Sequence, residues 1–325
     1  ALAVMRLVDR GALDLDHDVS GYLGWPFRNP AFPDRPITLR QLLSHQSSLT
    51  DDGDYVIPLG VKLGEWVRRK DVWDDVHPPG GGWFHYTNLN FAVVASVLER
   101  ATGKRFDRLM QELVLSPLEL DACFNWSGCS AEKIAAAVVL YDAAGAAVRD
   151  DLHGAAPDCL VVPDASGACD LSDYVPGDNG ALFSPQGGLR ISMRDLARLG
   201  QLLARRGEGF LSPQSFNEMM MPQWRFDGAN GVGENGESDG LFCAYGLGVH
   251  LIGSGGEGCN DDLFGDGVAR FGHPGEAYGL LSGLWIDPKT GAGLAYFTTS
   301  VPDGAPLGRS AFYAIEEEIV DRARQ

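Results

Sequence analysis

Residues 280–299 decide the fold class, and they read Leu280-Leu281-Ser282-Gly283-Leu284-Trp285-Ile286-Asp287-Pro288-Lys289-Thr290-Gly291-Ala292-Gly293-Leu294-Ala295-Tyr296-Phe297-Thr298-Thr299. Two apolar runs, 280–286 and 294–299, flank the turn-forming residues 287–291, and this pattern predicts an antiparallel β-hairpin. Apolar residues at every second position of 245–251 predict another strand. A further strand is expected from about Val268, and a helix at about 311–322 would cover the sheet.

The chain before this sheet is predicted to be mainly helical. Helices with capping or stop signals are expected at 1–10, 38–43, about 89–101, about 106–115, 193 to near 207, and from 213. Region 125–185 has weak periodicity and is predicted to be irregular. Helices first, an antiparallel sheet afterwards and a closing helix indicate an α+β or mixed α/β fold.

We expect a single domain over 1–325, because a chain of this length can bury one large core. A mainly helical and irregular part would cover about 12–240. The sheet and closing helix, about 241–325, would pack with the first helix at 1–11.

The composition limits the function classes. The formal net charge of −18 and the pI near 4.7 argue against nucleic acid or an anionic membrane as partner, because like charges repel. No stretch of about 18 apolar residues is present, so no transmembrane segment is predicted. No phosphate loop, dinucleotide fingerprint or Cys/His metal spacing is found, and the acidic stretch 260–267 lacks the EF-hand register, so we expect no cofactor or metal.

The six cysteines fall into three pairs that are local in sequence, each around a short stretch rich in Gly, Ser, Asp or Pro. The pairs are Cys123 with Cys129, Cys159 with Cys169, and Cys243 with Cys259. This spacing predicts three loop-closing disulfides, although six independent thiols are the alternative, since sequence alone does not determine connectivity. Disulfides would place the protein in the periplasm or outside the cell.

Two motifs have residue types that suit acyl transfer, which needs a nucleophile, a base and donors for an oxyanion. Tyr86-Thr87-Asn88 follows a glycine-rich loop and precedes a helix. A tyrosine with an ordinary pKa of about 10 acts as a base near neutrality only beside a cation, so Tyr86 implies a lysine or histidine partner. The alternative is a buried aromatic followed by a helix N-cap at Asn88.

The second motif is His273-Pro274-Gly275, followed by Glu276. A cation or hydrogen-bond donor at His273 would hold a substrate carboxylate or tune Tyr86, and Gly275 would let the substrate backbone approach. The backbone N–H of Glu276 is a candidate oxyanion donor. The alternative is an ordinary histidine at a strand end.

The chain resembles the class C β-lactamase, DD-peptidase and esterase superfamily over almost its whole length. The resemblance rests on five blocks in the family's order: 1–16, 37–49, Phe84-His85-Tyr86-Thr87-Asn88, 187–197 and Gly272-His273-Pro274-Gly275. It implies a β-lactamase/transpeptidase-like fold with Tyr86 as general base, Asn88 as a substrate amide anchor, and His273 with Gly275 as the third motif. His45 and His85 would be structural.

The resemblance also implies a serine and a lysine, spaced S-x-x-K, which we expect upstream of Ala1. The only internal S-x-x-K, Ser130 to Lys133, follows Tyr86 instead of preceding it and is interpreted as the start of a surface helix. No G-x-S-x-G elbow is present.

The predicted function is therefore that of a serine hydrolase acting through an acyl-enzyme on a D-Ala-D-Ala-like peptide, a β-lactam or an ester. Histidine in place of the third-motif lysine favours a peptidase or esterase over a dedicated β-lactamase. The alternative is a non-catalytic binding module, or an inactive fragment of the same fold.

Overall fold

The computed structural model describes residues 1–142, 144–233 and 239–325, which form two compact units. The first unit holds Ala1–Cys129 and Pro157–Arg190. The second holds the described residues of Ser130–Ala156 together with Ile191–Gly233 and 239–325. The second unit, which contains the sheet, thus includes 191–233, a segment that was predicted to belong to the helical part. Whether the chain forms one domain stays a prediction.

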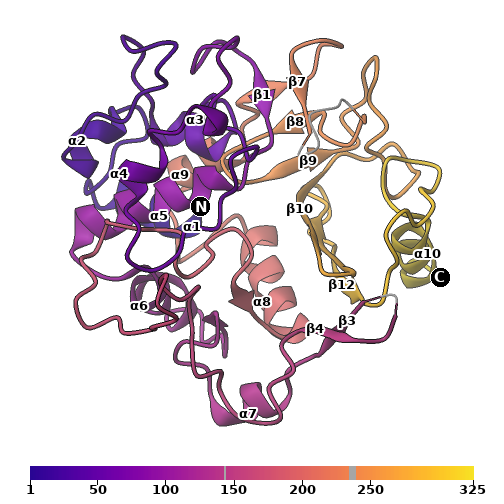
Figure 1. Cartoon of the computed structure of the whole chain (residues 1–325). Coiled ribbons are helices and arrows are strands. Elements are labelled where there is room, and N and C mark those ends of the chain that lie inside the picture. The colour runs from indigo at the N-terminus through magenta and orange to yellow at the C-terminus, as the bar shows by residue number, and fades with distance from the viewer. Residues whose placement is uncertain (143, 234–238) are drawn as a thin grey trace. The chain divides into compact units, whose positions relative to one another are not determined.

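The first unit is mainly helical. Its elements are α1 (Leu2–Asp9), α2 (Val19–Leu23), α3 (Leu39–Leu43), α4 (Leu63–Trp66), η1 (Lys70–Val72), β1 (Phe84–His85), α5 (Leu89–Thr102), α6 (Phe106–Met110), the π-helical turn η2 (Gln111–Leu115), and the paired strands β2 (Cys123–Phe124) and β5 (Leu189–Arg190). Figure 1 shows α2, α3 and α4 grouped around α5, and each of the three contacts it.

The signals at the helix ends act as the sequence predicts. Thr38 and Gln41 form the expected capping box at the start of α3. Helix α5 is buried along most of its length and ends at Gly103, whose φ of 69° is the left-handed conformation that glycine adopts at low cost. The predicted helix 106–115 is present, but its second half is wound as a π-helix.

The second unit contains a six-stranded antiparallel sheet in the order β12-β11-β10-β9-β8-β6, counted over the described residues. Its strands are β6 (Trp224–Arg225), β8 (Ala244–Tyr245), β9 (His250–Ile252), β10 (Arg270–Ala277), β11 (Leu280–Ile286) and β12 (Gly293–Thr298). The other elements are α7 (Ala131–Ala135), the paired β3 (Leu140–Tyr141) and β4 (Ala147–Arg149), α8 (Met193–Ala204), α9 (Pro213–Met220), β7 (Gly231–Val232) and α10 (Ala314–Ala323).

Helices cover both faces of this sheet, α8 on one side and α10 on the other (Figure 1). Leu284 of β11 lies against Gly200 of α8, so close that a Cβ at Gly200 would be 2.9 Å from it. On the opposite face, Trp285 and Tyr296 form an apolar cluster with residues of the C-terminal segment, including Val320. The α+β class predicted from the hairpin at 280–299 is confirmed.

One predicted strand is wrong. Residues 245–251 form two short strands, β8 and β9, joined by a tight turn, so that Tyr245 pairs with His250. The Gly246 N–H donates to the Val249 carbonyl over 2.8 Å, and Gly248 has a φ of 65°. Apolar residues do alternate with other residues over this segment, but two of the intervening residues are Gly246 and Gly248, which allow the chain to reverse direction.

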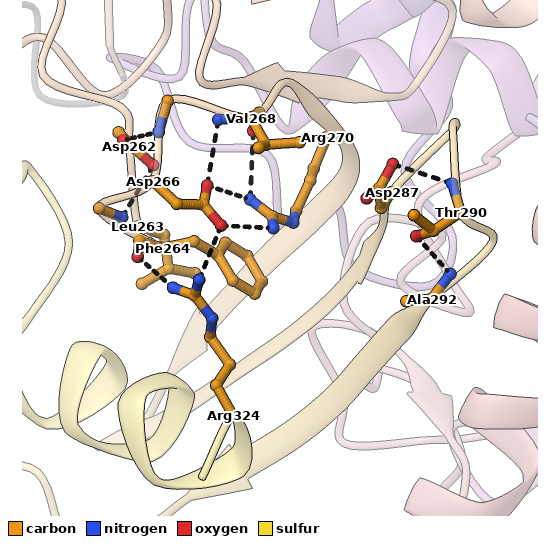
Figure 2. A network of polar contacts seen from close by, with 12 residues as sticks. Asp262, Leu263, Phe264, Asp266, Val268, Arg270, Asp287, Thr290, Ala292 and Arg324 are labelled. Carbon is orange, nitrogen blue, oxygen red and sulfur yellow. Dashed lines mark hydrogen bonds and ion pairs between the residues drawn. The ribbon is translucent and has the colours of Figure 1, made fainter.

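The acidic stretch 260–267 forms a turn before β10 that is held by ion pairs and hydrogen bonds (Figure 2). Asp266 pairs with Arg270 at 2.8 Å and with Arg324 beyond α10 at 3.0 Å. The Arg270 guanidinium also lies 3.8 Å from the centre of the Phe264 ring. Over the described residues no cluster of metal-ligating side chains is found.

The three predicted disulfides are confirmed as Cys123–Cys129, Cys159–Cys169 and Cys243–Cys259. They close loops with sequence separations of 6, 10 and 16 residues, and each lies within one unit. Among the described residues, no helix has the length and apolar character needed to cross a membrane.

Candidate functional site

In the first unit, the Tyr86 motif is held by His45. The two rings stack with centroids 4.4 Å apart and planes 21° from parallel. The backbone N–H of Thr87 donates to Nδ1 of His45 over 2.9 Å. Because Nδ1 accepts this hydrogen bond, neutral His45 carries its proton on Nε2. His45 therefore supports the Tyr86 ring and the backbone of the next residue, Thr87, in agreement with its predicted structural role.

Asn88 stands at the start of α5, but its side chain does not cap that helix. The cap comes from Asp51, whose carboxylate accepts the backbone N–H of Asn88 at 2.7 Å and that of Leu89 at 3.0 Å. Asp51 also accepts the Asn88 side-chain amide at 3.0 Å. Burial raises the pKa of Asp51, while these hydrogen bonds oppose that shift. Asp51 thus orients the Asn88 amide, although no sequence motif marks Asp51.

In the second unit, His273 lies on β10 and both of its ring nitrogens are engaged. Nδ1 is 2.5 Å from the Pro274 carbonyl, which can only accept, so Nδ1 carries a proton. In the neutral ring Nε2 is then an acceptor, and the Tyr245 hydroxyl donates to it over 2.8 Å. Burial lowers the pKa of His273 below its ordinary value. His273 is therefore neutral at pH 7.

Gly275 lies two residues further along β10, on the same face as His273, opposite Ser282 of β11. A Cβ at Gly275 would be 2.4 Å from the Ser282 hydroxyl, so a larger residue here would require the Ser282 side chain to turn away. Strand β9 pairs only with Arg270–Gly272. Among the described strands, β10 therefore has no second neighbour along His273–Ala277.

The Glu276 side chain points to the other face of β10, where its carboxylate accepts the Tyr313 hydroxyl at 3.0 Å. Its backbone N–H, the candidate oxyanion donor, stays a prediction. Tyr245 is a further residue at this site that no sequence motif marks. Its contact with His273 depends on the β8, β9 and β10 pairing, which brings residues 28 positions apart together.

The internal S-x-x-K is a helix start, as the sequence predicts. Ser130 is the N-cap of α7, and its hydroxyl accepts the backbone N–H of Lys133 over 3.1 Å. The Lys133 ammonium lies 3.8 Å from the Asp195 carboxylate. Both side chains of this pair thus have structural partners.

The geometry groups Tyr86 with His45 and Asn88 with Asp51 in one unit, and His273 with Tyr245 in the other.

Comparison with known proteins gives sequence relatives of hydrolytic type. The chain is 33% identical over 140 residues to esterase EstB of Burkholderia gladioli, an alignment that covers 38% of this chain and 35% of that one. It is 29% identical over 123 residues to the D-alanyl-D-alanine-carboxypeptidase/endopeptidase AmpH of Escherichia coli K12, covering 35% of this chain and 31% of the relative. The chain thus matches about a third of the length of each.

Solved structures of other proteins have a similar fold. The octameric penicillin-binding protein homologue from Pyrococcus abyssi matches with a TM-score of 0.63 at 19% identity, over 99% of this chain and 66% of that one. At this identity the likeness concerns the fold alone. The model of the family described as Beta-lactamase matches residues 1–317, nearly the whole sequence. With its sheet, its helical unit and its motifs in the family's order, the chain belongs to the beta-lactamase family.

Proposed function

We propose that the protein is a serine hydrolase that forms an acyl-enzyme, with Tyr86 as the general base. The nucleophilic serine and its lysine would come from an S-x-x-K motif upstream of Ala1. The observation that carries the proposal is the fixed Tyr86 ring, stacked on His45 within a family match that extends over residues 1–317.

In the proposed mechanism the upstream serine hydroxyl gives its proton to Tyr86, and its oxygen attacks the substrate carbonyl. The lysine cation lowers the pKa of the tyrosine so that it can accept that proton near neutrality. Backbone N–H groups, among them that of Glu276, would stabilise the oxyanion. The proton then passes to the leaving group, and water later releases the acyl group.

The charge of His273 supports a proposal for the substrate class. A residue that is neutral at pH 7 offers no fixed positive charge for a substrate carboxylate, which β-lactams and D-Ala-D-Ala-like peptides both carry. The binding of an ester without a carboxylate does not depend on a positive charge at His273. One relative is named an esterase. We therefore infer an ester as the preferred substrate. Asn88, held by Asp51, would bind the acyl side of the ester, and the edge of β10 at Gly275, which no described strand pairs with, would receive the rest of the substrate.

The proposed compartment is the periplasm or the exterior. The three disulfides, which close within short loops, support it because such bonds persist where thiols are not kept reduced.

The test uses the protein expressed from a reading frame extended upstream of Ala1. We expect it to hydrolyse p-nitrophenyl acetate, and Tyr86→Phe to reduce the acylation rate by about 100-fold or more, since a positioned base contributes about that much. Tyr141→Phe is the matched control, because Tyr141 is 43% exposed and lies on the short strand β3. Its activity should equal that of the parent protein.

Equal activity of Tyr86→Phe and Tyr141→Phe would exclude Tyr86 as the base. A folded extended protein that hydrolyses no ester, and is not labelled by a fluorescent penicillin, would exclude the hydrolase and favour the non-catalytic binding module.

A further inference from the structure

The first unit contains a cavity of about 490 Å³ that shares no residue with the Tyr86 and Asp51 groups. Its wall comes from four separate segments: the loop after α2, helix α4 with the residues after it, the end of α5, and the loop at Gly177–Asp178. The volume lies within the range of about 300–1,000 Å³ that is usual for small-molecule sites.

The charged residues of this wall are mostly cationic. They are Arg28, Lys62, Arg68 and Arg100, against the two acids Glu65 and Asp178. The whole chain has the opposite balance, with 26 Lys and Arg against 44 Asp and Glu. An excess of positive charge in a concave surface of an acidic protein attracts a small anion locally, where salt screens the distant charges.

Most of these cations are fixed in place. Arg100 donates to Asp178 over 2.6 Å, and the Lys62 ammonium lies 3.2 Å from the same carboxylate, so one negative charge meets two positive ones. The stem of Arg100 lies across Gly177, where a Cβ would come within 2.4 Å of it. Arg28 is held by Asp18.

Arg68 differs from the other three cations. It is exposed, and within the described part of the chain it forms no ion pair. A planar guanidinium without a partner is able to bind a carboxylate or phosphate through two hydrogen bonds.

The rest of the wall is apolar and includes an aromatic ring. Trp25 is half-buried, and its ring atoms lie 3.3–3.6 Å from the point where a Cβ at Gly64 would stand. Gly64 and Trp25 both line the cavity, as does Val67. An aromatic wall beside a cationic one suits a ligand that has both a ring and a negative charge.

We propose that this cavity binds a small organic anion, an apolar ring bearing a carboxylate or phosphate. The anionic group pairs with Arg68 beside Lys62, and the ring packs against Trp25. The proposal is independent of the hydrolase activity, since it uses none of the residues assigned to that reaction.

The experiment titrates the 325-residue chain with four probes and measures Kd by saturation-transfer NMR. Phenylacetate and phenyl phosphate carry both ring and charge, acetate has only the charge, and benzyl alcohol has only the ring. We expect one or both of the first two to bind at least about tenfold more tightly than acetate or benzyl alcohol, the difference that about 1.4 kcal/mol produces. Which of the two binds better identifies the anionic group.

Three variants test the residues. Arg68→Ala should weaken binding at least about tenfold, because both charge-assisted hydrogen bonds to the anionic group are lost. Glu65→Gln should tighten it, because a like charge is removed from the wall. Arg108→Ala is the matched control, since Arg108 is also exposed, lies on α6 and does not line the cavity. Its Kd should be unchanged.

The proposal is overturned if neither phenylacetate nor phenyl phosphate binds. It is equally overturned if benzyl alcohol binds as tightly as they do, or if Arg68→Ala and Arg108→Ala have the same Kd as the parent chain.

Discussion

At the scale of single residues, the candidate site depends on side chains that hold other side chains. Asp51 holds the start of α5 and the amide of Asn88, His45 holds the Tyr86 segment, and Tyr245 holds His273. The sequence motifs marked Tyr86, Asn88 and His273 as candidates to meet substrate, which stays a prediction, and no motif marked Asp51 or Tyr245. A signal for Asp51 exists: the first N–H groups of a helix need an acceptor, and Asn88 does not supply it.

The contribution of Asp51 is measurable as stability. We expect Asp51→Ala to lower the free energy of unfolding by about 1–2 kcal/mol, since it removes a helix cap and leaves backbone N–H groups unpaired. Asp52→Ala is the control, because Asp52 is exposed and should change stability by less than about 0.5 kcal/mol. Urea titrations of both variants provide the comparison. Equal stabilities of the two would show that Asp51 does not cap α5.

The neutral charge of His273 predicts a change of specificity. In the upstream-extended protein, His273→Lys should raise the acylation rate by a fluorescent penicillin relative to the rate with p-nitrophenyl acetate by about tenfold, because a permanent cation then meets the penicillin carboxylate. Stopped-flow measurement of both rates gives the ratio. An unchanged ratio would mean that charge at position 273 does not select the substrate.

At the scale of elements, local signals predicted most helices but not every strand. Ser192 and Ser212 cap α8 and α9 as expected, because capping needs only residues within one turn. The same local reading failed at 245–251, where alternation of apolar residues fits one strand or two strands of a hairpin equally well. The choice depends on pairing with β10, which is distant in sequence.

The turn before β10 predicts a pH dependence. The hydrogen bond from Arg270, together with Arg324, lowers the pKa of Asp266 from 3.8 to about 2. A carboxylate with a lowered pKa in the folded state stabilises the fold above the unfolded pKa and loses this effect as the pH falls. Stability should therefore decline between about pH 4 and pH 2.

Asp266→Asn should remove the part of this decline that is due to Asp266. It should also lower the free energy of unfolding at pH 7 by about 1–2 kcal/mol, a figure that allows for the partial exposure of the ion pair. Thermal unfolding at several pH values measures both effects. Asp303→Asn, at an exposed position, should keep the parent slope. If Asp266→Asn has the parent slope too, the ion pairs shown in Figure 2 do not stabilise the fold.

At the scale of the whole molecule, composition and the order of the motifs predicted more than any single motif. The fold class and the three disulfides were predicted correctly, because the hairpin at 280–299 and the cysteine pairs are local in sequence. The cavity at Trp25 and Arg68 was not predicted. Its wall comes from four segments that are far apart in the chain. None of them has a motif or an unusual composition, so the sequence does not indicate that they form a cavity.

The disulfides should stabilise the whole chain. Closing loops of 6, 10 and 16 residues is worth about 2–3 kcal/mol each in a chain-entropy estimate. Reduction with a phosphine under native conditions is therefore expected to lower the Tm markedly, as followed by circular dichroism. An unchanged Tm after complete reduction, verified by mass spectrometry, would contradict this and would also weaken the proposed extracytoplasmic location.

The central claim is that an acyl-enzyme forms at a serine outside the 325 residues while Tyr86 moves the proton. Peptide mapping by mass spectrometry after reaction with a fluorophosphonate tests it most directly. We predict a single adduct, on the serine of an S-x-x-K motif upstream of Ala1, in the extended protein. An adduct on Ser130, or no adduct in a folded extended protein, would contradict the account.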